Sequence, residues 1–224
     1  MSEEKKLYGI LKRILDFLIS GLSVLVLSPI LLIIAILIKV GSPGPVFYRG
    51  VRVGRNSQLF DMLKFRTMVV DAEKKGASST ADDDPRLTGI GKFLRKFKLD
   101  ELPQLLNVVL GQMSLVGPRP QVEWATKLYK DEEKLLLSVP PGMTDVASIT
   151  FRNEGEILAG STNPDQDYLE KIAPEKIRLG LNYVRQRSLV TDFKIIMATV
   201  FALLGFSRGT RYLLLNFQKV PGTY

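Results

Sequence analysis

The 224-residue chain contains no cysteine and no histidine. Without cysteine there can be no disulfides, thiolate zinc sites or cysteine nucleophiles. Without histidine there can be no Ser-His-Asp catalysis, imidazole general base or histidine-ligated metal. The side chains left for chemistry are carboxylates, lysine, tyrosine and hydroxyls, and any metal is expected to be a hard ion such as Mg²⁺ held by oxygen.

Negative charge is also scarce, because 31 Lys and Arg residues face 23 Asp and Glu residues, for a net charge of +8. This balance predicts a polyanionic partner: a phospholipid surface, nucleotide phosphates or nucleic acid. Since 46% of the residues are hydrophobic, the membrane is favoured. Nucleic acid rests on charge alone, because no nucleic-acid motif accompanies it, and it is not expected as a partner.

The N-terminal part contains a long uncharged run from Phe17 to Ile38, enough for a helix to cross a hydrocarbon layer of about 30 Å. Ser28-Pro29 stands near its middle, where proline removes a backbone donor and bends the helix. Both flanks are basic, whereas a spanning helix normally has its positive flank on one side. A re-entrant helix-break-helix that enters one leaflet and returns is predicted; a kinked spanning helix is the alternative.

Beyond this segment, residues 46–67 predict a β-hairpin and residues 92–98 a basic amphipathic helix suited to the headgroup layer. Lys64 and Arg66 share one strand face by period two, so they are either phosphate ligands or a solvated basic face. Three acids at 82–84 are either a metal site or a solvated run. Further helices are expected over 121–137, 175–187 and 191–206, and a short strand or loop over 148–152.

The central stretch is 98–107, where apolar residues recur with helical spacing and Pro103 is tolerated only in a first turn. Asp100 and Glu101 are therefore predicted at a helix N-terminus, which stabilises a carboxylate as an anion and attracts phosphate. Asp100 is either a nucleophile or an N-cap. Downstream, Arg119 stands between two prolines in a rigid loop and suits bidentate phosphate contact.

These motifs together resemble a known family, the bacterial sugar transferases, which are monotopic polyprenyl-phosphate phosphoglycosyl transferases. The resemblance extends from Lys12 to about Thr199. It rests on the following segments: Ser28-Pro29, Pro43-Gly44-Pro45-Val46-Phe47, Lys64-Phe65-Arg66-Thr67-Met68, Leu94-Arg95, Leu99-Asp100-Glu101-Leu102-Pro103-Gln104-Leu105, Met113-Ser114-Leu115-Val116-Gly117-Pro118-Arg119-Pro120, Pro141-Gly142 and Asp192-Phe193-Lys194-Ile195. Many short motifs in this order make a strong signal.

The resemblance implies transfer of a phosphosugar from a UDP-sugar to polyprenyl (undecaprenyl) phosphate, releasing UMP, as the first membrane step of surface polysaccharide or glycoconjugate biosynthesis. By this resemblance Asp100 is the nucleophile that forms a covalent phosphosugar-aspartate. Glu101 completes the dyad, positioning Mg²⁺ or assisting deprotonation, with both carboxylates as candidate metal ligands. Lys64, Arg95 and Arg119 match cations of the site, and Asp192 matches a residue that holds one of them.

The implied fold is α/β and mostly helical: a re-entrant membrane helix over 1–40, a catalytic domain over 41–206 with a small hairpin and amphipathic interfacial helices, and a tail over 207–224. The implied location is the cytoplasmic face of the bacterial inner membrane, in contact with its lipid, and a homodimer is allowed for. The segment 143–154 departs from the pattern of many members, which leaves Arg152 and Glu154 as candidate donor contacts and the sugar unpredicted. A non-catalytic membrane-bound interaction protein is the alternative.

Overall fold

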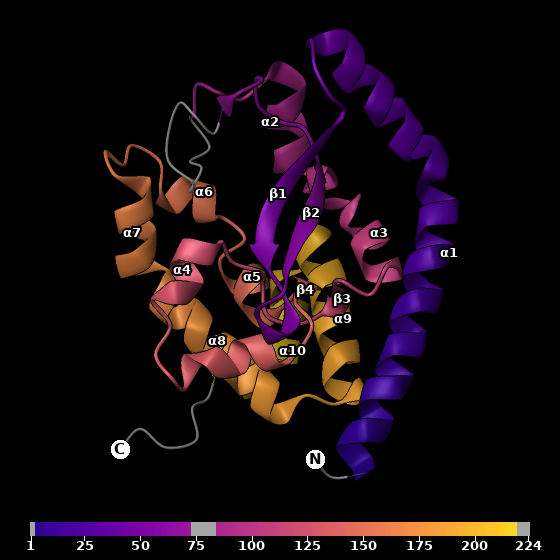
Figure 1. The fold of residues 1–224 in the computed structure, drawn as a ribbon, viewed down its shortest axis with the longest axis vertical. Helices are drawn as coiled ribbons and strands as arrows, with labels where there is room; N and C mark the ends of the chain where they lie inside the picture. Colours follow the sequence, from indigo (N-terminus) through magenta and orange to yellow (C-terminus); the bar gives the residue numbers. More distant parts are fainter. Residues whose placement is uncertain (1–2, 73–83, 219–224) are drawn as a thin grey trace.

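One long helix, α1 (Glu3–Gly41), runs along one side of all the other elements (Figure 1). The computed structural model describes residues 3–72 and 84–218, so two acids of the 82–84 run lie outside the described residues. Within the described ranges, α1 is the one helix long and apolar enough to span a membrane. Most of its large apolar side chains are exposed, including Leu22, Leu25 and Val26.

The predicted break at Ser28-Pro29 is wrong, because α1 continues through Pro29 as one helix whose axis bends (Figure 1). Proline lacks the N–H that would bond the carbonyl four residues earlier, here that of Leu25. The Ser28 hydroxyl donates to this carbonyl at 2.8 Å and so replaces the missing donor. The helix therefore bends without opening, and its re-entrant course stays a prediction.

The hairpin is confirmed as β1 (Phe47–Val53) and β2 (Leu59–Phe65), which pair antiparallel with Phe47 opposite Phe65. The short 3₁₀ turn η1 (Arg55–Ser57) joins them, with Asn56 at φ 54°. Alternation along β2 buries Phe60 and Met62, which pack against α3. The hairpin thus lies over the central helix and carries Lys64 at its end.

The central stretch forms three short elements: α2 (Gly89–Lys96), the 3₁₀ turn η3 (Leu99–Glu101) and α3 (Gln104–Val109). α3 packs against α1. Arg13 of α1 donates to the carbonyls of Val108 and Val109 at 2.5 and 2.8 Å, and so caps the carbonyl end of α3. The membrane-type helix and the central helix are joined as one unit.

A second sheet, which the sequence did not predict, pairs β3 (Ser114–Val116) in parallel with β4 (Gly142–Thr144). At its end Gly117 and Gly142 meet so closely that a Cβ on Gly142 would lie 2.1 Å from the Gly117 nitrogen. Only glycine permits this approach. The crossing brings the loop of Arg119 beside Asp145, whose Oδ2 accepts from the Arg119 backbone N–H at 3.1 Å.

The C-terminal half is helical, and its described elements are α4 (Glu123–Lys127), η4 (Glu133–Ser138), α5 (Val146–Thr150), α6 (Glu154–Ile157), α7 (Pro164–Lys171), α8 (Ala173–Gln186), α9 (Leu189–Leu203) and α10 (Ser207–Gln218). The helices expected over 175–187 and 191–206 are confirmed as α8 and α9. The helix expected over 121–137 is wrong, because it divides into α4 and η4, and 148–152 is largely helical α5 rather than strand or loop. The main core joins α5, α8 and α9 to Leu214 of α10.

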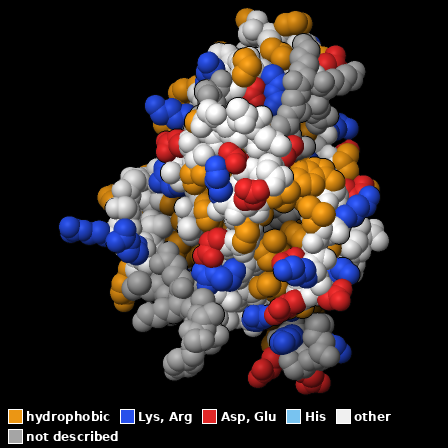
Figure 2. Space-filling view, turned by 90° about the vertical axis from the view of Figure 1, so that its left-hand side faces the viewer, with side chains coloured by type: hydrophobic (Ala, Val, Ile, Leu, Met, Phe, Trp, Pro, Cys, Tyr) orange, Lys and Arg blue, Asp and Glu red, His pale blue; other side chains and the backbone are white. Residues whose placement is uncertain are grey.

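The face farthest from α1 differs from it in character. Figure 2 shows this face, where acidic and basic side chains are interspersed with hydrophobic ones. Its helices α4, α7 and α8 carry the exposed pair Lys127–Glu123 and the partly exposed pairs Lys171–Asp167 and Arg178–Glu175. The face with charges of both signs is therefore expected to contact water, and the apolar side chains of α1 are expected to contact lipid.

Candidate active site

The predicted dyad lies in η3, before α3 rather than inside its first turn. The chain leaves α2, turns at Lys98 with a left-handed φ of 57°, and forms one 3₁₀ turn in which the Leu102 N–H donates to the Leu99 carbonyl at 3.3 Å. Pro103 then precedes α3, and neither short element has a side-chain cap in the described structure. The N-cap interpretation of Asp100 is therefore wrong, and its carboxylate is left for another use.

Glu101 is held by two cations from two other elements. Its Oε1 accepts from Lys64 of β2 at 2.9 Å, its Oε2 accepts from Arg119 at 2.9 Å, and a second Arg119 nitrogen reaches Oε1. Burial raises the pKa of Glu101, but the charges of Arg119 and Lys64 outweigh burial and hold it well below its ordinary value. Glu101 is ionised and saturated with donors.

Asp100 is more buried and less well paired than its neighbour. It is 6% exposed, and its Oδ2 is 4.0 Å from the Lys64 ammonium. Its Oδ1 is buried and has no hydrogen-bond partner among the described residues. Burial raises the pKa of Asp100, the Lys64 charge opposes this, and the Glu101 charge adds to it. An under-compensated carboxylate beside cations is a reactive arrangement.

Lys98 belongs to this cluster although the sequence analysis gave it no role. Desolvation lowers the pKa of its ammonium group. The charges of Glu101 and Asp100 raise this pKa, and those of Arg119 and Lys64 lower it further. Arg95 of α2 is also near enough to lower the pKa of Asp100. The signal in the sequence was a lysine directly before the turn of the dyad, but its approach to Arg119 depends on the tertiary fold.

Two predicted substrate-binding residues, Arg66 and Arg152, are engaged elsewhere. The buried guanidinium of Arg66 donates to the carbonyls of Pro43 and Ser42 at 2.5 and 2.9 Å, so it fixes the turn after α1. Arg66 lies just after β2, which ends at Phe65. The alternation that was expected to place Arg66 on the same face as Lys64 therefore does not apply to it. Arg152 donates to the carbonyl of Ala202 and so binds the carbonyl end of α9.

Asp192 also has partners away from the dyad. Its Oδ2 accepts from Lys12 at 2.8 Å and from Tyr8 at 3.0 Å, both on α1, and its Oδ1 accepts from Tyr183 at 2.8 Å. Burial and the Asp192 charge raise the pKa of Tyr183, so the phenol stays a donor. In this structure Asp192 binds α1 to the core and holds none of the cations of the dyad.

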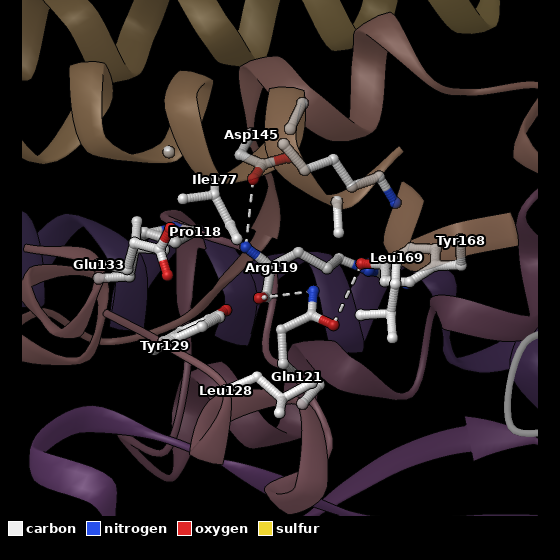
Figure 3. A pocket seen from close by; sticks show the side chains of 16 residues that line it. Pro118, Arg119, Gln121, Leu128, Tyr129, Glu133, Asp145, Tyr168, Leu169 and Ile177 are labelled. Carbon is white, nitrogen blue, oxygen red and sulfur yellow. Dashed lines mark hydrogen bonds between the residues drawn. The ribbon is translucent and has the colours of Figure 1, made fainter. Parts of the chain in front are cut away.

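A cavity of about 80 Å³ opens beside the loop of Arg119 (Figure 3). Its lining is mostly apolar, with Gln121 fixed between the Arg119 carbonyl and the Tyr168 hydroxyl, which donates to the Gln121 Oε1 at 3.2 Å. Burial raises the pKa of Tyr129 to about 12, so this phenol is neutral. The cavity offers uncharged hydrogen-bonding groups next to the charged cluster.

The two carboxylates partly match a magnesium site. Mg²⁺ in phosphoryl-transfer sites takes one or two carboxylates and fills its other positions with water and substrate phosphate. The unpartnered Asp100 Oδ1 fits one such position, whereas Glu101 must first release a cation. Among residues 3–72 and 84–218, no three acidic side chains gather at one point, so the phosphates would have to supply the remaining ligands.

Comparison with known proteins identifies the family. Residues 7–205 match the family model described as "Bacterial sugar transferase". The chain belongs to the bacterial sugar transferase family. It is 37% identical over 217 residues to the exopolysaccharide production protein ExoY of Sinorhizobium fredii, covering 90% of this chain and 88% of that protein.

Two relatives with more specific names are longer. One is the UDP-glucose:undecaprenyl-phosphate glucose-1-phosphate transferase of Escherichia coli, 38% identical over 196 residues, which cover 86% of this chain and 40% of that protein. Another is the UDP-N-acetylgalactosamine-undecaprenyl-phosphate N-acetylgalactosaminephosphotransferase of Aeromonas hydrophila, 33% identical over 201 residues, covering 88% of this chain and 44% of that protein. This sugar transferase thus spans less than half the length of either.

Proposed function

We propose that this sugar transferase moves a phosphosugar from a UDP-sugar to polyprenyl phosphate, with Asp100 as the nucleophile. The observation that carries the proposal is the buried Asp100 carboxylate, with one oxygen unpartnered, beside the cations that bind Glu101. The names of the Escherichia coli and Aeromonas hydrophila relatives supply the reaction class: undecaprenyl phosphate as acceptor and a UDP-sugar as donor.

In the first step an Asp100 oxygen attacks the phosphorus that bears the sugar. A bond forms between this oxygen and phosphorus, the bond to the bridging oxygen breaks, and UMP leaves with the electron pair. Before the step the carboxylate carries one negative charge and the diphosphate two; after it the acyl phosphodiester carries one and UMP two. Because charge balances without a proton, the absence of histidine does not hinder the step.

In the second step a phosphate oxygen of the lipid attacks the same phosphorus, and Asp100 leaves as a carboxylate. The lipid dianion and the acyl phosphodiester give a diphosphate with two negative charges and one free carboxylate, so no proton is needed here either. Phosphoryl transfer depends mainly on position and charge neutralisation. A cationic cluster is therefore better suited to this reaction than a proton relay.

The residues of the cluster divide these tasks. Lys64 and Arg119 neutralise substrate phosphate, and Arg95 adds positive potential near Asp100. Glu101 keeps both cations in place before substrate arrives. Asp100 and Glu101 would hold Mg²⁺, which would supply charge neutralisation for the leaving phosphate. Because Arg119 and Lys64 hold the pKa of Glu101 well below its ordinary value, its carboxylate would be ionised and able to serve as a ligand.

The apolar helix α1 brings the two substrates together. Its exposed side chains favour lipid, and Arg13 of the same helix is bonded to α3, just after the dyad. A lipid phosphate at the headgroup level then lies near a site open to a soluble donor. This arrangement favours a core on the cytoplasmic face of the bacterial membrane, where nucleotide sugars are made.

The deciding experiment measures UMP release by the purified protein with Mg²⁺, undecaprenyl phosphate and a panel of UDP-sugars. We expect release with one or a few donors and none after chelation. With donor alone, intact mass should show a phosphosugar adduct on the wild type and none on Asp100→Asn. Release that persists unchanged in Asp100→Asn would overturn the proposal, and silence across the panel would favour the non-catalytic interaction protein.

A further inference from the structure

The charges around the dyad do not pair evenly. Lys64 and Arg119 are both bound to Glu101, and Lys98 stands directly before the turn that carries the two carboxylates. Among the described residues, no hydrogen bond or ion pair within 4.0 Å engages the Lys98 ammonium. Lys98 therefore brings an unengaged cation to the turn that carries Asp100, whose Oδ1 also lacks a partner in the described structure.

The position of Lys98 suits a ligand better than a structural contact. The residue keeps an exposed surface although neighbouring groups partly desolvate its ammonium, so a substrate can reach it. Lysine carries its charge on a flexible stem with three donors, and it can move to a phosphate without first breaking an ion pair in the protein. Lys64 and Arg119 must each release Glu101 before they can bind a phosphate.

The backbone adds an independent observation. Lys98 has φ 57°, in the left-handed region that glycine and asparagine adopt at less cost than lysine. Its N–H donates to the Arg95 carbonyl, and its own carbonyl accepts from the Glu101 N–H at 3.4 Å. The strained residue thus joins the end of α2 to the dyad, and its side chain starts two residues before Asp100.

We propose that Lys98 is an additional phosphate-binding residue of this site, and that its ammonium group binds a phosphate oxygen of the reacting substrate. The inference rests on the proposed function. The shared chemistry is a phosphate with two negative charges, which either the nucleotide diphosphate donor or the lipid phosphate acceptor can supply. When this substrate is bound, the positive charge of Lys98 balances part of the negative charge of the phosphate.

The test compares Lys98→Asn with the matched variant Lys96→Asn. Asparagine tolerates the left-handed backbone, so Lys98→Asn removes the charge and keeps the turn, whereas Lys96→Asn removes the same charge from an exposed position on α2. We expect the KM of one substrate to rise about tenfold or more in Lys98→Asn, the effect of losing one charge-assisted hydrogen bond. Lys96→Asn should stay within about twofold of wild type, and Lys98→Arg should recover most of the loss.

The substrate whose KM rises identifies the source of the phosphate, donor or acceptor. Unchanged KM values for both substrates in Lys98→Asn, or an equal change in Lys96→Asn, would overturn the inference. If Lys98→Asn does not fold, Lys98→Gly replaces it, because glycine adopts this conformation freely. If the wild type shows no transfer, the proposed function fails separately. Titration of undecaprenyl phosphate and of UDP into wild type and Lys98→Asn then decides the inference by binding alone: weaker binding of either to the variant supports it, and equal binding of both overturns it.

Discussion

Two aspartates of this protein, Asp100 and Asp192, are buried to the same 6% exposed fraction and differ in how their oxygens are used. Around Asp192 both oxygens have partners: Tyr183 donates to one, and Tyr8 and Lys12 donate to the other. Around Asp100 one oxygen lies 4.0 Å from Lys64 and the other has no partner in the described structure.

The difference supports the roles proposed for the two residues, a structural carboxylate for Asp192 and a nucleophile for Asp100. A buried charge that is fully paired links elements, and Asp192 joins α9 to α1 across 180 residues of sequence. A buried carboxylate with a missing partner is destabilising unless a ligand or a reaction uses it. We therefore expect opposite responses when each aspartate is changed to asparagine.

The largest effect is expected from Asp100→Asn, which should lower transfer about a thousandfold or more, because an amide is not a nucleophile. The same variant should melt at the same or a higher temperature at neutral pH, since an uncharged isostere is easier to bury. UMP release and the thermal unfolding midpoint in detergent measure the two effects. A large loss of stability would mean that Asp100 is structural after all.

Glu101→Gln should lower kcat about a hundredfold, the effect of removing one preorganised charge from a phosphoryl-transfer site. Lys64 and Arg119 then lose the carboxylate that holds them and are free to pair with Asp100. We also expect the Mg²⁺ concentration for half-maximal rate to rise. An unchanged Mg²⁺ dependence would remove Glu101 from the proposed ligands while leaving its role toward the cations intact.

Asp192→Asn should destabilise the fold by about 3 kcal/mol, because it leaves the Lys12 ammonium without its buried partner. This corresponds to roughly 6 to 12 °C in the unfolding midpoint. The exposed Glu123 of α4 provides the control, and Glu123→Gln should not change the midpoint measurably. If the folded Asp192→Asn protein instead keeps its midpoint and loses activity, Asp192 belongs to the site and the comparison is wrong.

The pH dependence of adduct formation should test the burial of Asp100. Burial raises the pKa of Asp100 above 3.8, and only the ionised form attacks. The rate of adduct formation should therefore fall about tenfold per pH unit below that raised pKa. A raised folded pKa stabilises the folded state fully below 3.8, and this contribution is lost as pH rises through the folded pKa. An acid limb at or below 3.8 would contradict the burial of the nucleophile.

The smallest effect is expected from Tyr183→Phe. The hydroxyl donates to Asp192 at 2.8 Å and lies 3.1 Å from the Val116 carbonyl, so its removal should destabilise the fold by about 1 to 3 kcal/mol. Transfer per folded molecule should stay within about twofold. Combining Tyr183→Phe with Asp192→Asn should give less than the sum of the two, because Tyr183→Phe removes, and Asp192→Asn weakens, the same hydrogen bond.

Short-range features of the fold were predicted from sequence because their causes are local. Alternation predicted the hairpin of β1 and β2, and helical spacing predicted α3 behind Pro103. The break at Ser28-Pro29 was also a local argument, and it was wrong because a neighbouring hydroxyl replaced the missing donor. The parallel pair β3 and β4 was missed, since its strands have three residues each and lie 26 residues apart along the chain.

The sequence by itself determined which chemistry is open to this protein: no thiol, no imidazole, two adjacent carboxylates after a basic helix, and an arginine held between prolines. The tertiary structure decided which charges meet. It brought Lys64, Lys98 and Arg119 to the dyad, turned Arg66 to the end of α1, and joined Asp192 to Lys12. The physical reason is that a charge is satisfied by whichever partner the folded chain brings within a few ångströms, and sequence spacing carries that information only inside one helix or strand.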